Sequence, residues 1–394
     1  MSDDSDSVSE TTSTSWFGRL GQAFGGIIFG IILVIAACIG LFWNEGNAVK
    51  TARSLQEGAG LVQAVSTDKV DAANEGKLIY ISGPLSTEGP ASDGEFAMKS
   101  KGLRLVREVQ MYQWKQETEE QSKKNLGGGE TTTRTYKYSK EWSAVPVNSG
   151  EFHTPKGHEN PRMTWRSRDT LAPRIKLGAF AVPDGLMSAF GGQKPLAAGD
   201  EQVQAVKTRT EKAVQVVDGV IYVGNPDQPA VGDYKISFRE VEQQPASIVA
   251  RQAGSGLGAY AAKAGRTVEL IKAGIVPAAQ LFQQAQDENR MITWIIRLVG
   301  SVAMFIGFAL ILRPLSVLAD VLPFLGDIVG AGVGVVALLC TVVLAPIMIA
   351  IGWFTYRPLV AVIVLVAGGA LSFGVVHLLR RRKAQKTGAA AAPA

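Results

Sequence analysis

The sequence predicts an α+β integral membrane protein with four transmembrane helices and a large β-rich extracytoplasmic domain. Two observations carry this prediction. Long apolar segments with few charges lie at both ends of the chain, one before and three after a polar stretch of roughly 250 residues. Within that polar stretch, short segments alternate between apolar and polar residues, as half-buried strands do. The charged fraction of 19% is below the ~25% of soluble domains, which agrees with apolar ends.

The N-terminal part begins with residues 1–19, an acidic segment rich in serine and threonine that we predict to be a disordered cytoplasmic tail. Residues 20–43 form the first apolar segment, which exceeds the ~20 residues that a membrane-spanning helix needs. Because it is long and no small-residue cleavage site precedes a polar region, we interpret it as a retained transmembrane helix and not as a signal peptide.

Residues 44–290 form the predicted β-rich domain. Residues 103–114 and 131–142 alternate over a dozen positions each, and a glycine-rich segment joins them, which predicts a long antiparallel hairpin. The two cysteines, Cys38 and Cys340, both lie inside apolar segments, so the domain has no disulfide and its fold depends on its own core.

The C-terminal part contains one ionisable residue well inside an apolar segment, Arg297. We expect its side chain to reach the membrane interface near Trp294, and the alternative is a buried cation in a transport pathway. The remaining predicted segments are a helix at 291–312, an interfacial segment at 314–326, a helix at 328–355 kinked at Pro346, a helix at 358–379 and a basic cytoplasmic tail at 380–394.

The basic cluster within residues 380–386 indicates topology, because positive residues beside a membrane span usually stay in the cytoplasm. Four spans then place both termini in the cytoplasm and the large domain on the other side. No nucleic-acid reading module accompanies the cluster, so nucleic-acid binding is not expected.

Candidate chemistry is sparse. His153 and His158, with Glu151 or Glu159, are the best metal-ligand set, but the surrounding prolines and glycine favour a turn-rich loop. Phosphate loops and nucleophile elbows are missing from the sequence. We therefore predict no enzyme activity, cofactor or metal. A membrane-anchored hydrolase that uses His158, Glu159 and Asp169 stays open as one alternative, and a channel or transporter subunit as another.

Several segments together resemble the transmembrane protein 43 family, also called LUMA. They lie at residues 44–52, 105–114, 157–161, 231–238 and 352–359, in the family's order and with one predicted span before and three after the domain. The resemblance singles out residues that we expect to be structural or to contact partners: Asn44, Glu45, Gly46, Tyr112, Trp114, Glu141, Trp142, His158, Asn160, Pro161, Tyr356, Arg357 and Pro358.

The resemblance implies a non-enzymatic scaffold that organises membrane protein complexes. Animal members of the family are scaffolds of the inner nuclear membrane and endoplasmic reticulum that self-associate and contact lamins and emerin. The composition of this chain, rich in alanine and glycine, favours a bacterial member in the inner membrane with a periplasmic domain. In a eukaryote the place would be the nuclear envelope or endoplasmic reticulum. The expected partners are membrane lipids, further copies of the chain and other membrane proteins.

Overall fold

The computed structural model describes residues 6–188, 190–359 and 362–363. The chain divides into a β-rich unit, formed by Met1–Thr14, Ser54–Asn125 and Glu130–Asp287, and a helical unit, formed by Ser15–Arg53, Leu126–Gly129 and Glu288–Ala394. The predicted class, α+β with a β-rich domain and apolar helices, is therefore confirmed.

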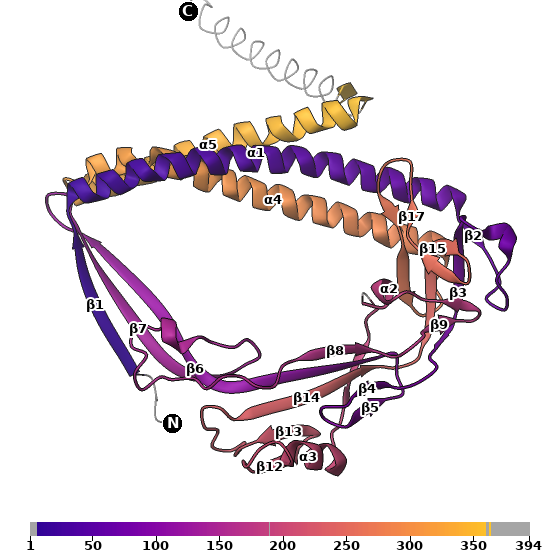
Figure 1. Ribbon diagram of the computed structural model, residues 1–394. Helices are drawn as coiled ribbons and strands as arrows, with labels where there is room; N and C mark the ends of the chain where they lie inside the picture. The colour runs from indigo at the N-terminus through magenta and orange to yellow at the C-terminus, as the bar shows by residue number, and fades with distance from the viewer. Residues whose placement is uncertain (1–5, 189, 360–361, 364–394) are drawn as a thin grey trace, which may run out of the picture. The chain divides into compact units, whose positions relative to one another are not determined.

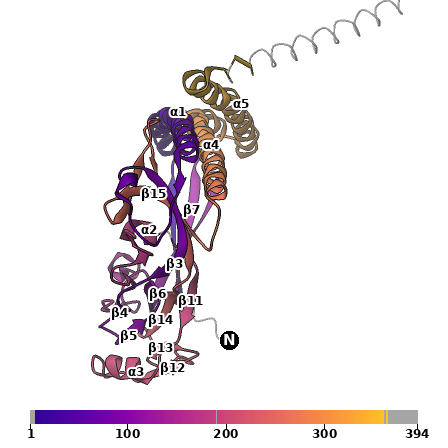
Figure 2. The same cartoon turned by 90° about the vertical axis from the view of Figure 1, so that its right-hand side faces the viewer.

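The helical unit is built from long apolar helices: α1 (Trp16–Leu61), α4 (Ala278–Ala319) and α5 (Pro323–Tyr356). Figures 1 and 2 show α1 and α4 side by side. All three are long and apolar enough to cross a membrane, and they contain the predicted spans at 20–43, 291–312 and 328–355. The predicted helix at 358–379 lies almost entirely outside the described residues, as does the basic tail at 380–394.

Helices α1 and α4 run antiparallel and approach closely through glycines. A Cβ atom placed on Gly30 would lie 2.7 Å from the carbonyl oxygen of Gly307, and one placed on Gly300 would lie 2.7 Å from Leu41 Cδ2. Leu41 also packs in an apolar cluster with Met304 of α4 and Ala345 of α5. Small residues allow such contact where lipid leaves no hydrophobic force between helices.

The turn between α4 and α5 corrects one prediction. We expected a separate interfacial segment at 314–326, but α4 continues through Pro314 to Ala319, and α5 begins at Pro323. An apolar environment favours a continuous helix because it satisfies backbone groups internally, even around a proline. Pro346 likewise lies inside α5, as expected.

A buried ion pair stabilises this turn. Arg19 of α1 donates to Asp320 Oδ2 over 2.6 Å and to the Gly128 carbonyl over 2.7 Å. Gly128 has a positive φ of 80°, and a Cβ there would lie 2.3 Å from the Trp16 ring, so the position requires glycine. Residues 126–129, which form the turn between β6 and β7, therefore belong to the helical unit.

In the described part of the chain, the β-rich unit contains two large sheets and two small ones. The eight-stranded sheet has the order β1 (Asp6–Thr14), β7 (Glu130–Ser143), β6 (Arg104–Lys124), β14 (Tyr234–Val241), β13 (Val220–Val223) and β12 (Val214–Val217), with β11 (Gln193–Leu196) on β14 and β8 (Arg168–Leu171) on β6. The seven-stranded sheet has the order β19 (Leu270–Ala273), β15 (Pro245–Ala253), β16 (Gly256–Gly258), β10 (Phe180–Ala181), β9 (Lys176–Leu177), β3 (Leu78–Ser86) and β2 (Gln63–Ala64).

The smaller elements fill the edges of this unit. They are the strand pairs β4 (Ala91–Asp93) with β5 (Met98–Ser100) and β17 (Tyr260–Ala261) with β18 (Thr267–Val268), the helices α2 (Asp184–Ser188) and α3 (Asp200–Lys207), and two 3-10 turns at Ala72–Asn74 and Ser149–Glu151.

Strand β6 has two different halves. Its first half buries every second side chain, among them Leu105, Val109 and Met111, in a core that also holds Phe96 and Phe238. Its second half is polar and pairs with β7 in the predicted hairpin, which Figure 1 shows. The strand extends to Lys124, ten residues beyond the prediction, because the pairing with β7 continues to the turn.

The N-terminal segment corrects a second prediction. Residues 1–19 were expected to be a disordered cytoplasmic tail, but residues 6–14 form β1, which pairs with β7 over nine positions, and α1 begins at Trp16. The threonines in residues 1–19, which led us to predict a tail, also favour strands. In β1 they lie opposite the threonines of β7. Ser9 Oγ lies 3.0 Å from Thr135 Oγ1 across the pair.

Candidate functional site

Four of the residues singled out by the resemblance lie in two clusters of contacting side chains, one in each unit. The Glu45 cluster, in the helical unit, consists of Glu45, Arg297, Trp294 and Trp353. The His158 cluster, in the β-rich unit, consists of Trp114, Tyr138, His158 and Asn160.

The Glu45 cluster is centred on a two-point ion pair. Arg297 Nε lies 2.7 Å from Glu45 Oε1, and Arg297 Nη2 lies 2.8 Å from Glu45 Oε2. Trp353 Nε1 donates a third hydrogen bond to Glu45 Oε2 over 2.9 Å. Glu45 is 1% exposed, so these three donors replace the water that a carboxylate otherwise needs. Helices α1, α4 and α5 each supply one of the three side chains.

Two indole rings surround the guanidinium group. Arg297 Cζ lies 4.6 Å from the centroid of the Trp294 ring and 5.7 Å from that of the Trp353 ring. These distances are typical of cation–π contacts. The Arg297 side chain is 12% exposed and paired with Glu45. The expectation that it reaches the membrane interface stays a prediction. A carboxylate on the neighbouring helix neutralises it locally.

Neighbouring residues shape the space for this pair. A Cβ on Gly352 would lie 2.7 Å from Glu45 Cβ, and one on Gly46 would lie 2.6 Å from the Tyr356 ring. Asn44 Nδ2 donates to the Thr293 carbonyl over 3.2 Å. The first motif, Asn44 to Gly46, therefore meets the motif at the end of α5. Beyond Tyr356, Arg357 and Pro358 are exposed and follow the helix end.

The His158 cluster fastens a long loop to the hairpin. The His158 ring stacks on Tyr138 at 3.8 Å between centroids and meets Trp114 edge-on at 4.6 Å. His158 Nδ1 lies 2.9 Å from the Thr154 carbonyl oxygen, and the residue is 4% exposed. The ring thus fills a gap between two strands and a loop, as a core aromatic does.

The Asn160 side chain takes the place of a neighbouring strand by bonding to the backbone of Trp114. Its Oδ1 accepts from Trp114 N over 2.7 Å, and its Nδ2 donates to the Trp114 carbonyl over 2.9 Å. The phenolic oxygen of Tyr138 accepts from Thr154 N over 2.8 Å and donates to Gln116 Oε1. Both side chains satisfy backbone groups where regular pairing has stopped.

The remaining motif residues lie near the same strands. Tyr112 and Trp142 are cross-strand neighbours with ring centroids 5.3 Å apart. Glu141 Oε2 accepts from Lys115 Nζ over 3.3 Å, and hydrogen bonds to Glu117 and then Glu141 raise the pKa of Lys115. Pro161 packs on Gly232, where a Cβ would lie 2.9 Å from the Pro161 ring. Each of these residues therefore has a contact within the β-rich unit, as a structural role predicts.

The residues of the alternative chemical sites each have other contacts in the structure. Within the described residues, no group of three or more histidine, cysteine, aspartate or glutamate side chains is arranged for a metal ion. His153 stacks on Tyr136 at 4.0 Å. Glu159 accepts from the Gly157 amide, a bond that lowers its pKa, and Asp169 accepts from Arg104 Nε over 2.7 Å. The hydrolase candidates are therefore occupied by separate structural contacts.

Comparison with known proteins identifies the family. The family model described as Transmembrane protein 43 matches residues 111–358. The chain belongs to the transmembrane protein 43 family. Mouse Transmembrane protein 43 is 33% identical over 392 residues, which cover 95% of this chain and 94% of the relative. The human protein is 33% identical over 92% of both chains, and the Drosophila homologue is 27% identical over 92% of this chain and 95% of its own. No solved structure matches the chain.

Membership in the transmembrane protein 43 family establishes a membrane protein with several apolar helices. The sequence motifs did not identify Trp353 and Arg297 as members of one site. A usable signal was present, because a cation inside an apolar segment needs a nearby carboxylate, and Glu45 lies directly at the end of the first apolar segment.

Proposed function

We propose that this protein is a non-enzymatic scaffold that organises membrane protein complexes. The observation that carries the proposal is the Glu45 cluster. Its charges neutralise each other between three helices, so they fix how α1, α4 and α5 pack. Buried polar groups that are fully satisfied specify one arrangement of the elements that carry them.

A channel or transporter subunit has less support. Ionisable residues that serve a pathway usually line a water-filled cavity or form a chain of several such groups. Glu45 and Arg297 are instead held by two hydrogen bonds to each other, and Glu45 has a third from Trp353. The pair therefore links α1 to α4 inside the helical unit.

The scaffold has two surfaces for partners. The apolar helices expose large side chains, such as Ile32, Leu298 and Val343, that suit lipid tails or further copies of the chain. In the described order of the eight-stranded sheet, β1 forms one end, and an edge strand offers backbone groups for pairing. Membrane lipids, a homo-oligomer and other membrane proteins are the proposed partners.

We place the β-rich unit on the extracytoplasmic side and residues 380–394 in the cytoplasm, with a further span at 358–379 after α5. The basic cluster supports this orientation. In a bacterium the unit is then periplasmic and the protein lies in the inner membrane. In a eukaryote it lies in the lumen of the nuclear envelope or endoplasmic reticulum.

Strand β1 sets a condition on this orientation. Because β1 pairs with β7 and β2 pairs with β3, strands on both sides of α1 belong to the β-rich unit. A crossing by α1 that left residues 6–14 in the cytoplasm would break the nine pairs with β7. In place of the cytoplasmic N-terminus we therefore propose one on the side of the β-rich unit, which leaves α4, α5 and residues 358–379 as the proposed crossing segments.

Reconstitution tests the scaffold against the channel. Full-length protein, labelled with donor or acceptor dyes, is placed in liposomes, and energy transfer and ion flux are measured together. We expect transfer that falls as unlabelled protein is added, and flux equal to that of protein-free liposomes. Flux that is lost in Glu45→Gln and kept in Glu211→Gln, a change at an exposed carboxylate, would establish a pathway and refute the scaffold.

A further inference from the structure

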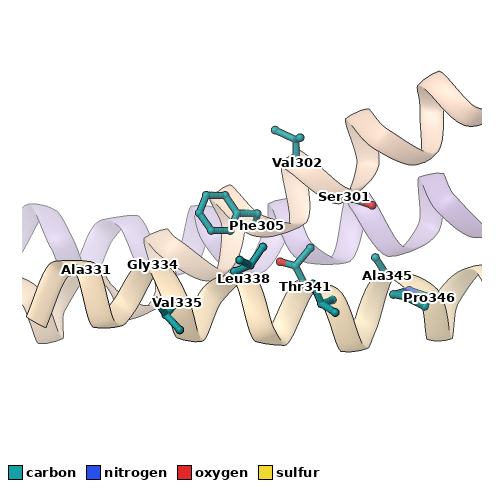
Figure 3. A pocket seen from close by; sticks show the side chains of 11 residues that line it. Ser301, Val302, Phe305, Ala331, Gly334, Val335, Leu338, Thr341, Ala345 and Pro346 are labelled. Atoms are coloured by element: carbon teal, nitrogen blue, oxygen red, sulfur yellow. The ribbon is translucent and has the colours of Figure 1, made fainter.

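The helical unit has apolar surface for lipid tails. An open groove of about 660 Å³ lies between α4 and α5, and Figure 3 shows Phe305 of α4 and Leu338 of α5 at the space between the two helices. Its two hydroxyl groups, on Ser301 and Thr341, bond to carbonyl groups of their own helices, and the described residues that line it carry no charge. Any preference for one lipid headgroup has to come from charged residues elsewhere.

Two exposed tryptophans lie where the apolar surface of this unit ends. Trp43 of α1 is 58% exposed and Trp294 of α4 is 68% exposed. They lie at the same level, because Asn44 Nδ2 donates to the Thr293 carbonyl. On α1, exposed apolar side chains precede Trp43 and polar residues follow it. Since tryptophan gathers where lipid tails meet headgroups, we take this level as that boundary.

Two exposed arginines lie just beyond this boundary. Arg53 Nη2 donates to the Tyr356 carbonyl over 2.9 Å, and Arg357 is the next residue after that carbonyl. A Cβ on Gly46 would lie 2.6 Å from the Tyr356 ring, and Gly46 follows Trp43 by about 5 Å along α1. The headgroup layer is about 5–7 Å thick on each side of a bilayer. Tyr356 therefore brings both arginines to the depth of lipid phosphates.

Neither arginine is neutralised by a carboxylate in the part of the chain that the structure describes. Glu45, which precedes Arg53 on α1, is paired with Arg297. Glu57, one turn after Arg53, accepts from Lys263 N over 2.9 Å. The bond to the α5 carbonyl uses one of the five N–H groups of Arg53, so donors remain for a ligand. Guanidinium groups match phosphate, to which each can donate two parallel hydrogen bonds.

We propose that Arg53 and Arg357 bind the phosphate of an anionic phospholipid, whose tails lie against the exposed apolar side chains of the helices. The proposal rests on the proposed role of membrane lipids as partners, and it adds the class of lipid and the residues that select it. A zwitterionic lipid has a phosphate too, but the cation of its own headgroup compensates that charge. Two uncompensated arginines therefore favour a headgroup with net negative charge.

Counting the lipids bound to purified full-length protein, by native mass spectrometry in detergent, tests this site. Phosphatidylglycerol and phosphatidylcholine with identical tails are titrated into the parent and into Arg53→Gln/Arg357→Gln. We expect the parent to bind phosphatidylglycerol severalfold more tightly than phosphatidylcholine, and the double variant to lose that preference. The matched control Arg162→Gln/Arg166→Gln removes two exposed arginines of the β-rich unit and should keep it.

A second double variant separates charge from packing at the end of α5. Arg53→Lys/Arg357→Lys retains both positive charges but loses the planar guanidinium groups. It should keep a preference for phosphatidylglycerol, weaker than that of the parent. If the lysine variant binds the two lipids as the glutamine variant does, the loss reflects disturbed packing around Tyr356, and the proposal is overturned.

Further outcomes separate this site from the proposed lipid partnership. Equal binding of the two lipids by the parent, or an unchanged preference in the glutamine variant, would overturn the site and leave the lipid partnership standing. Binding of neither lipid would count against both. Inorganic phosphate in excess over the lipid should not displace phosphatidylglycerol, because it lacks the tails. Displacement would identify a free anion as the ligand and overturn the proposal.

Discussion

Glu45 and Arg297 form a two-point ion pair across 252 residues of sequence, at distances of 2.7 and 2.8 Å. The antiparallel packing of α1 and α4 brings them together, and Trp353 of α5 completes the site. Charges buried in this way are costly unless each has a partner, so the pair restricts which helix arrangements are stable.

Removing one charge of this pair should be far more harmful than removing both. Arg297→Met leaves the Glu45 carboxylate buried with Trp353 alone, and we expect a loss of about 3–5 kcal/mol of stability. The double variant Glu45→Gln/Arg297→Met keeps an acceptor for the Trp353 indole and should recover most of it. Thermal unfolding in detergent measures both.

Lys50→Met is the control for this series, because Lys50 is an exposed residue on the same helix. It should change the unfolding temperature little. A double variant as unstable as Arg297→Met would mean that packing around the arginine stem, and not charge compensation, stabilises the site.

Adding one methyl group should change the unfolding temperature differently on the two faces of α1. In Gly30→Ala the new Cβ would lie 2.7 Å from the Gly307 carbonyl oxygen, and overpacking of this kind costs about 1–3 kcal/mol. In Gly25→Ala the Cβ meets no described heavy atom within 4 Å, so that variant should gain slightly from helix propensity. Unfolding temperatures that move equally would show that α1 and α4 do not pack through Gly30.

The Asn160 side chain should contribute measurably to the β-rich unit. Asn160→Ala removes both bonds to the Trp114 backbone and leaves those groups without a side-chain partner, at a cost of about 1–3 kcal/mol. Asn225→Ala, at an exposed position, should cost less. Chemical unfolding monitored by tryptophan fluorescence measures the difference, and equal midpoints would contradict the role of Asn160.

Glu269 should make stability depend on pH in an unusual direction. Burial raises its pKa above the ordinary 4.5, so the folded chain binds this proton more tightly than the unfolded chain. Its contribution to stability is therefore largest below pH 4.5 and falls as pH rises through the raised pKa. Glu269→Gln should increase the unfolding temperature at neutral pH and leave it unchanged in acid.

Glu88 provides the opposite sign as a control. Lys176 and then Arg174 lower its pKa, so any stability it adds is present above 4.5 and lost in acid. Glu88→Gln should not increase the unfolding temperature at neutral pH. An increase in both variants would point to general charge repulsion, not to burial of Glu269.

The pairing of β1 with β7 should persist in membranes. Ser9 and Thr135 have hydroxyl groups 3.0 Å apart, so Ser9→Cys with Thr135→Cys should form a disulfide, and both should be labelled from the same side. Ser9→Cys with Thr131→Cys, four positions out of register, should not cross-link. Labelling of positions 9 and 135 from opposite sides would show that α1 crosses the membrane and that β1 is absent there.

Long apolar segments and segments with alternating residues made much of the fold predictable. The apolar segments at 20–43, 291–312 and 328–355 lie inside α1, α4 and α5, because length and composition alone suffice for such helices. The alternation in residues 103–114 likewise predicted β6 and its hairpin. Residues 6–14 were missed because serine and threonine suit both a solvated tail and a strand, and only the partner β7 decides between them.

The sequence by itself determined that the chain is a membrane protein with a β-rich domain, since hydrophobicity and period are local properties that need no knowledge of neighbours. Only the tertiary structure decided that Arg297 meets Glu45 and that Asn160 binds the Trp114 backbone. Those contacts join positions far apart in the chain, and their energies depend on distance and desolvation, which no local pattern of residues encodes.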